Sequence, residues 1–170
     1  MRVPLAKAGK ARKVSLRTAG RRRAASSLPV AISPLPPFMI TDFIITRVTA
    51  LPLETLCRRL IEVATSHKFG VLATHNLREK MEGKGVPFAR ECRVIEVCNP
   101  QQAAAVLSQA IEISTALPCR ISVYEEGGRT MLATIKPTAL LTLFGVPGAV
   151  AAAQEVEDTM VAIMDEACRG

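Results

Sequence analysis

The sequence lacks the short cysteine motifs that mark a disulfide framework or a zinc site. It has five cysteines, an odd number, and no two of them form a C-x-x-C pair. Disulfide frameworks need paired cysteines and zinc knuckles need closely spaced ones, so neither is indicated. Free thiols are typical of a reducing compartment, and we therefore expect a cytoplasmic protein. The cysteines are Cys57, Cys92, Cys98, Cys119 and Cys168.

Long apolar runs and familiar catalytic motifs are also missing. The least interrupted apolar stretch, residues 139–156, contains Thr142, Gly145, Pro147 and Gly148. A membrane helix needs about 20 predominantly apolar residues, so no membrane span is predicted. The sequence has no phosphate-binding glycine loop, no nucleophile elbow and no carboxylate pair of known spacing. These absences favour a protein that is not an enzyme, without deciding the question, and no cofactor is predicted.

Acidic residues are absent from the first 38 positions. That segment holds nine of the 22 Lys and Arg residues, which leaves 13 basic residues against 15 acidic ones in residues 39–170. The net charge of +7 therefore belongs to the N-terminal segment and not to the part that is expected to fold. Nucleic-acid binding by a domain needs a basic face on folded structure. We predict such binding only if the basic segment 1–38 is part of the protein.

Residues 1–38 are predicted to be disordered. Basic clusters such as Arg21-Arg22-Arg23 are followed by four prolines between Pro29 and Pro37, with no helical or strand period. Such a segment cannot bury enough apolar surface to offset the entropy of ordering it. The prolines also interrupt the apolar residues 28–38, which argues against a secretory signal. Three interpretations stay open: a start codon assigned too early, with Met39 as the true first residue; a disordered basic arm; and a transit peptide.

Residues 39–170 are predicted to form one α+β domain. In residues 53–68, Leu53, Leu56, Leu60 and Val63 recur at spacings of three and four, as on the buried face of a helix. The order of elements predicts helices packed on one face of a mostly antiparallel sheet. We expect strands at 43–48, 71–74, 92–97, 119–125 and 131–135, helices at 53–68, 77–82, 100–113 and 147–167, and an apolar turn at 138–144.

The start of the helix 100–113 is well marked and places a cysteine beside it. Asn99 is a good N-cap and Pro100 a good first helical residue. Cys98 then lies next to the partial positive charge of the helix N-terminus, which lowers the pKa of a thiol. Cys98 is therefore the candidate reactive thiol. The alternative is that Cys98 is a small buried apolar residue at the end of a strand.

A metal or haem site is a second alternative. The helix 100–113, about 20 Å long, would carry the chain back past its strand, so that strands 92–97 and 119–125 run parallel. Cys98 and Cys119 would then lie at opposite edges of the sheet, whereas His75, Cys92 and Cys119 would share one edge. Such ligands suit zinc, iron or haem. No local spacing supports this set, and the alternative is a solvated His75 with two packed cysteines.

Two further groups receive no functional role. His67 falls in the last turn of its helix, where a surface cap is the expected role because a cation complements the helix dipole. Residues 124–126, Tyr-Glu-Glu, would serve acid–base chemistry only if a pocket faced them. Paired acids at a hairpin are usually solvated.

Four short motifs resemble the family called domain of unknown function 302. They are Phe69-Gly70-Val71-Leu72, Cys98-Asn99-Pro100, Leu117-Pro118-Cys119 and Val123-Tyr124-Glu125. The resemblance covers residues 41–168. It implies a small, usually stand-alone prokaryotic protein with a TATA-binding-protein-like α+β architecture and no established activity. The basic leader and Thr74-His75-Asn76 depart from the family's usual pattern.

The sequence as a whole predicts a non-catalytic binding or accessory protein of unknown ligand. We expect a small apolar pocket or a dimer surface on the sheet, and a homodimer. The alternatives are a thiol or redox-sulfur protein that uses Cys98, a metal- or haem-binding protein that uses His75 with Cys92 and Cys119, and nucleic-acid binding through residues 1–38.

Overall fold

The computed structural model describes residues 42–169. The predicted leader, residues 1–38, and the expected domain start at Met39 lie outside the described residues. Within the described range, no helix is both long enough and apolar enough to cross a membrane.

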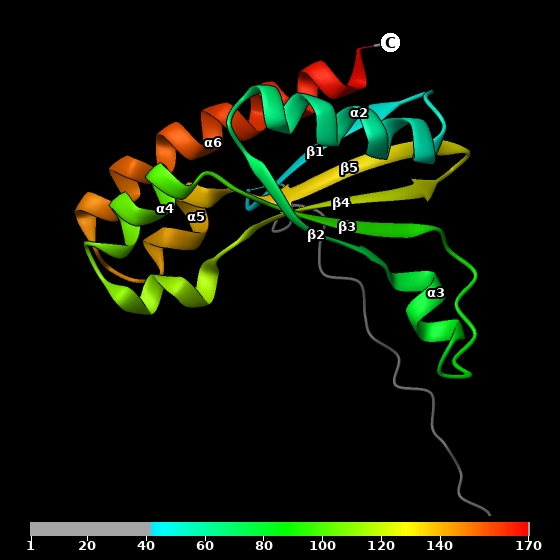
Figure 1. The fold of residues 1–170 in the computed structure, drawn as a ribbon, viewed down its shortest axis with the longest axis horizontal. Helices are drawn as coiled ribbons and strands as arrows, with labels where there is room; N and C mark the ends of the chain where they lie inside the picture. Colours follow the sequence, from blue (N-terminus) through cyan, green and yellow to red (C-terminus); the bar gives the residue numbers. More distant parts are fainter. Residues whose placement is uncertain (1–41, 170) are drawn as a thin grey trace, which may run out of the picture. The chain divides into compact units, whose positions relative to one another are not determined.

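Five strands in the described part of the chain form one sheet, in which every neighbouring pair is antiparallel. The strand order is β1-β5-β4-β3-β2, and Figure 1 shows α2 and α6 on one face of the sheet. The predicted class, an antiparallel α+β fold with helices on one face, is therefore confirmed. The elements are β1 (Ile44–Thr49), α2 (Leu53–Ser66), β2 (Gly70–Asn76), α3 (Leu77–Glu82), β3 (Cys92–Cys98), α4 (Pro100–Leu107), η1 (Ile111–Ala116), β4 (Cys119–Glu126), β5 (Arg129–Ile135), α5 (Pro137–Thr142) and α6 (Pro147–Cys168).

The direction of β4 relative to β3 was predicted wrongly. The two strands are antiparallel, with Val97 opposite Cys119 and Cys92 opposite Tyr124. The predicted helix 100–113 is in fact split into α4, which is eight residues long, and the 3-10 helix η1. At 1.5 Å per residue, α4 spans only about 12 Å. The chain turns at residues 108–110 and returns through η1 to the end of the sheet that it left.

The hairpin between β4 and β5 turns at the two glycines that the sequence predicts. Gly127 and Gly128 have φ angles of 58° and 75°, in the left-handed region where a side chain would be strained. The resulting register pairs Val123 with Leu132, and both are fully buried on the helix-covered face. The turn therefore fixes which side chains of both strands enter the core.

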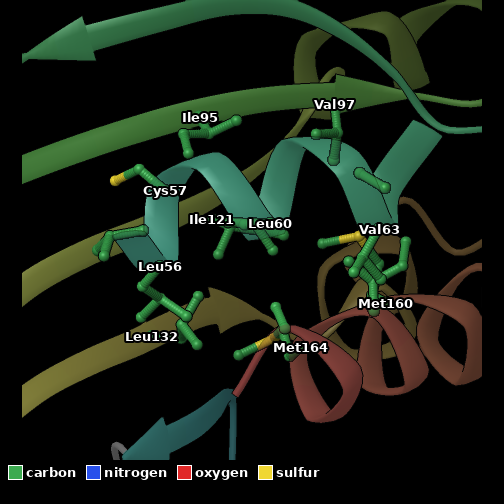
Figure 2. Close-up of a cluster of buried hydrophobic side chains, with 14 of the residues drawn as sticks. Leu56, Cys57, Leu60, Val63, Ile95, Val97, Ile121, Leu132, Met160 and Met164 are labelled. Carbon is green, nitrogen blue, oxygen red and sulfur yellow. The ribbon is translucent and has the colours of Figure 1, made fainter. Parts of the chain in front are cut away.

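The main core lies between the sheet and the helices α2 and α6. Leu56 and Leu60 of α2 are fully buried, and Figure 2 shows them pointing at the sheet residues Ile121 and Leu132. Met160 of α6 completes the same cluster. Full burial of a leucine side chain contributes about 1.5–3 kcal/mol, so this stripe of α2 is a main source of the domain's stability.

A second apolar cluster packs α4, η1, α5 and α6 against one another. Its buried members are Val106, Ile113, Leu141, Ala149 and Ala153. The two alanines of α6 are completely buried, and their small side chains let neighbouring elements approach this helix closely. This cluster holds the elements that surround the candidate site.

Polar contacts fasten the end of α6 to α2 and β1. His67, at the C-terminal end of α2, lies with its Nε2 3.0 Å from a carboxylate oxygen of Glu166. Arg47 of β1 pairs with Asp165, and this contact holds the pKa of the Asp165 carboxyl below its usual range. The contact between His67 and Glu166 links the end of α2 to α6.

Candidate ligand pocket

An apolar pocket of about 100 Å³ lies where the chain leaves β3 for α4 and where η1 leads back into β4. Strand ends form its floor, and α4, α5 and α6 supply further walls. Most of the lining is hydrocarbon, contributed among others by Phe69, Val97, Val106, Leu140, Leu141 and Val156. The elements around it therefore leave a partly open apolar hollow at this end of the sheet.

The N-terminus of α4 borders the pocket and has the cap that the sequence predicts. The Asn99 side-chain oxygen accepts hydrogen bonds from the backbone N–H groups of Gln101 and Gln102, at 3.0 and 3.2 Å. Pro100 is the first helical residue. The first turn of α4 is therefore fixed, and Gln102 and Ala103 are held in the pocket wall.

Polar groups of the wall are few, and most of them already have partners. The Thr134 hydroxyl donates to the backbone carbonyl of Arg120 at 2.7 Å. The Arg120 guanidinium is directed to Glu96, with an Nε–Oε1 distance of 3.1 Å. Gln102 also belongs to the lining, but its side-chain oxygen is buried away from the open space and accepts no hydrogen bond from any described residue.

Cys98 and Cys119 both line this pocket, contrary to the expectation that they lie at opposite edges. The antiparallel pairing of β3 and β4 explains the difference, because Cys119 stands opposite Val97, the neighbour of Cys98. The two thiols therefore line one site, and the parallel strand direction predicted from the sequence had separated them.

Both thiols of the pocket are held in the neutral form. Burial raises the pKa of Cys119 to about 11, and the nearby Cys98 thiol adds to this by repulsion between thiolates. Burial also raises the pKa of Cys98. This direction is opposite to the lowering expected from the helix N-terminus, because burial disfavours the charged thiolate.

The predicted metal or haem ligands do not come together. His75 stands opposite Val94 and Cys92 opposite Tyr124, whereas Cys119 lies at the other end of β4. The expectation of a shared edge is wrong because it rested on parallel strands. Within residues 42–169, no group of three or more His, Cys, Asp and Glu side chains is arranged to hold a metal ion.

His75 instead joins a polar chain on the face of the sheet away from α2 and α6. Its Nε2 lies 3.5 Å from Glu96 Oε1, and its Nδ1 lies 2.7 Å from the Lys80 ammonium. Glu96 is shared with Arg120, whose hydrogen bond lowers the pKa of the Glu96 carboxyl. Each of these four side chains has a partner of opposite charge or a hydrogen bond, as in a structural network.

Residues 124–126 do not line the pocket. Glu126 pairs with Arg90 at 3.0 Å near the exposed hairpin. Burial raises the pKa of Tyr124, so its hydroxyl keeps its proton at neutral pH. This arrangement fits the solvated hairpin that was the alternative to an acid–base role.

Gln102 is the residue of the site that sequence reasoning missed. A glutamine in the first turn of a helix carries no chemical signature. The only available signal was its neighbourhood, because Ala103 and Val106 continue an apolar stripe of α4 beside it. Recognition of a second apolar cluster around α4 and residues 138–144 would have been needed to place it in a wall.

Comparison with known proteins gives a family and a fold. A family model described as "Domain of unknown function DUF302" matches residues 44–167. A crystal structure of an uncharacterized conserved protein DUF302 from Bacillus stearothermophilus has a TM-score of 0.72 and 34% sequence identity to this chain. The match covers 75% of this chain and 98% of that one. No curated protein matches.

Proposed function

Because this chain belongs to the DUF302 family, a domain of unknown function, we propose its function from its own pocket: it is a binding or accessory protein that takes a small apolar molecule without transforming it. The observation that carries the proposal is the pocket between the strand ends and α4, α5 and α6. Neither the resemblance seen in the sequence nor membership of the family assigns an activity to the protein.

The size and lining of the pocket support a small apolar ligand. An apolar cavity of about 150 Å³ engineered into another protein stays dry and binds benzene. The pocket here, at about 100 Å³, is of the same order and has a largely hydrocarbon lining. Filling such a space recovers dispersion contacts that the empty wall lacks. Affinity therefore comes from shape and apolar contact.

The titratable groups of the wall support binding without catalysis. A general acid or base works best when its pKa lies near the working pH. The described lining contains no His, Asp, Glu or Lys, and its two thiols have raised pKa values. Its remaining charged group, Arg120, is paired with Glu96 on the outer face of the sheet.

A thiol function at Cys98 remains the second candidate, favoured by one observation. Cys98 and Cys119 line the same pocket, so a ligand in it would be close to two sulfur atoms. The nucleophile in thiol chemistry is the thiolate. Since the pKa values of both groups are raised, this candidate requires a ligand that lowers them, and it ranks below simple binding.

The test is to fill the pocket. We expect benzene to give a saturation-transfer NMR signal with the wild-type protein, and Ala103→Leu to abolish it, because the larger side chain occupies the space. Ala105→Leu is the matched control, since Ala105 lies on the exposed side of the same helix. It should keep the wild-type signal.

Two outcomes would reject the proposal. One is no benzene signal with the wild-type protein. The other is a signal that Ala103→Leu and Ala105→Leu leave equally intact, which would place the benzene elsewhere. Circular dichroism of each variant confirms that a lost signal is not a loss of folding.

A further inference from the structure

The chain enters β1 beside the pocket. β1 starts at Ile44, which stands opposite Ile135 at the end of β5, and Ile135 lines the pocket. The backbone N–H of Lys136 donates to the Phe43 carbonyl at 2.8 Å. Residue 43 is therefore bonded to the backbone between two lining residues, Ile135 and Pro137. The polypeptide that precedes β1 joins the domain at the rim of the pocket.

The rim at this point is apolar and open to solvent. Ile135 is 50% exposed although it lines the pocket, and Phe43 is 51% exposed. Pro137 and Leu140 continue the lining from Ile135 with hydrocarbon and no charge. Apolar surface at the mouth of an apolar hollow is better covered by another apolar group than by water.

The sequence immediately before the described residues contains such groups. Phe38, Met39 and Ile40 are consecutive, and only Thr41 and Asp42 separate them from residue 43. An extended chain spans about 3.3 Å per residue, so Ile40 can reach about 10 Å from residue 43 and Phe38 about 17 Å. The phenyl ring of Phe38 is the size of benzene, and a hollow of about 100 Å³ is of the order that takes such a ring.

We propose that residues 38–40 occupy the pocket when no ligand is bound, so that the protein's own chain competes with the ligand. The proposal adds a regulation to the proposed function and rests on it. The segment 38–40 carries no charge, in keeping with a wall whose charged residue, Arg120, is paired with Glu96.

The tether makes this contact effective and also reversible. A segment joined by a short linker acts at an effective concentration in the millimolar range, without any diffusion to the site. Ordering the segment costs backbone entropy, which offsets much of the gain from burying its side chains. A ligand of modest affinity can therefore displace residues 38–40.

The first experiment removes the apolar side chains from the segment in the full chain and measures the dissociation constant of benzene by NMR titration. A pocket that is open for about one fifth of the time raises the apparent dissociation constant about fivefold. We expect Phe38→Ser/Ile40→Ser to bind benzene about fivefold more tightly than the wild type does. Val30→Ser/Ile32→Ser is the matched control, with the same spacing further from β1, and should keep the wild-type affinity.

The second experiment needs no ligand. An aromatic ring displaces the NMR resonances of the methyl groups that it packs against. We expect Phe38→Ser/Ile40→Ser to shift the methyl resonances of Leu140 and Val156, which line the pocket and are partly exposed. The methyl resonances of Leu60, which is fully buried in the main core, should stay where they are and report that the fold is intact.

The outcomes separate this inference from the proposed function. Shifted wall methyl groups in a protein that binds no benzene in any variant would remove the proposed function and leave the docking of residues 38–40 in place. Equal benzene affinity in the wild type and Phe38→Ser/Ile40→Ser, with unshifted methyl groups, would overturn the docking while the pocket stands. A gain that appears only at high protein concentration would assign the occupant to a second copy and overturn the contact within one chain.

Discussion

At the scale of single residues, the environment of a side chain decides its chemistry more than its neighbours in the sequence do. The sequence places Cys98 beside a helix N-terminus and so predicts a lowered pKa. The structure half-buries it, and the pKa rises instead. Burial is a property of the assembled pocket, to which α4, α5 and α6 all contribute, and no local pattern around residue 98 reports it.

Cys119 gives a prediction about stability at alkaline pH. Its pKa is about 11 in the folded protein, against about 8.5 in an unfolded chain. Between these values the folded state binds more protons than the unfolded state, so the free energy of unfolding falls as the pH rises. The contribution is complete below pH about 8.5 and is lost by about 11.

We expect Cys119→Ala to reduce the slope of this fall by up to about 1.4 kcal/mol per pH unit, the equivalent of one proton. Urea unfolding at several pH values between 8 and 11 measures it. Ser108→Ala, which changes no ionisable group, should keep the wild-type slope. Equal slopes in Cys119→Ala and the wild type would contradict the buried, neutral thiol.

At the scale of elements, the helices and strands are largely predictable because each has its own signal. The stripe of α2, the cap of α4 and the glycine turn of the β4–β5 hairpin all lie where local patterns indicate. The split of residues 100–113 into α4 and η1 was not predictable in this way, since residues 108–110 contain no proline or glycine. Because this turn was missed, β4 was predicted to run in the wrong direction, and Cys119 was predicted at the wrong end of the sheet.

The cap of α4 gives a prediction at this scale. Removing a side-chain N-cap costs about 0.5–2 kcal/mol. Because α4 has only eight residues, its cap is a large part of what stabilises it. We expect Asn99→Ala to lower the free energy of unfolding by that amount in urea titrations. Gln101→Ala, at an exposed position two residues further on, should change the free energy of unfolding by much less. A loss equal in both variants would argue against the cap.

At the scale of the whole molecule, the face of the sheet away from α2 and α6 is the surface that the dimer expectation concerns. In Figure 1, neither helix covers this face. Val48 and Ile135 lie on it and are 46% and 50% exposed. Val48 stands opposite Met131, which in turn stands opposite Tyr124. Apolar side chains gathered on one face favour contact with another protein surface.

We expect the protein to be a homodimer through this face. Val48→Arg should shift it to the monomer by placing a charge where apolar surface is buried. Leu143→Arg is the control, because Leu143 is 79% exposed at the end of α5 and should leave the dimer intact. Light scattering after size-exclusion chromatography gives the mass directly. A wild-type monomer at micromolar concentration would remove the expectation.

The segment between β3 and β4, which contains α4 and η1, contributes to the pocket and not to the sheet. It leaves β3 and rejoins the neighbouring strand β4 at the same end of the sheet, and in between it supplies Asn99, Gln102, Ala103 and Val106 to the pocket. The residues paired between β3 and β4, 92–97 and 119–124, lie outside it. Substitutions at the pocket-lining positions of residues 99–118 can therefore change what the pocket recognises without altering a residue of the sheet.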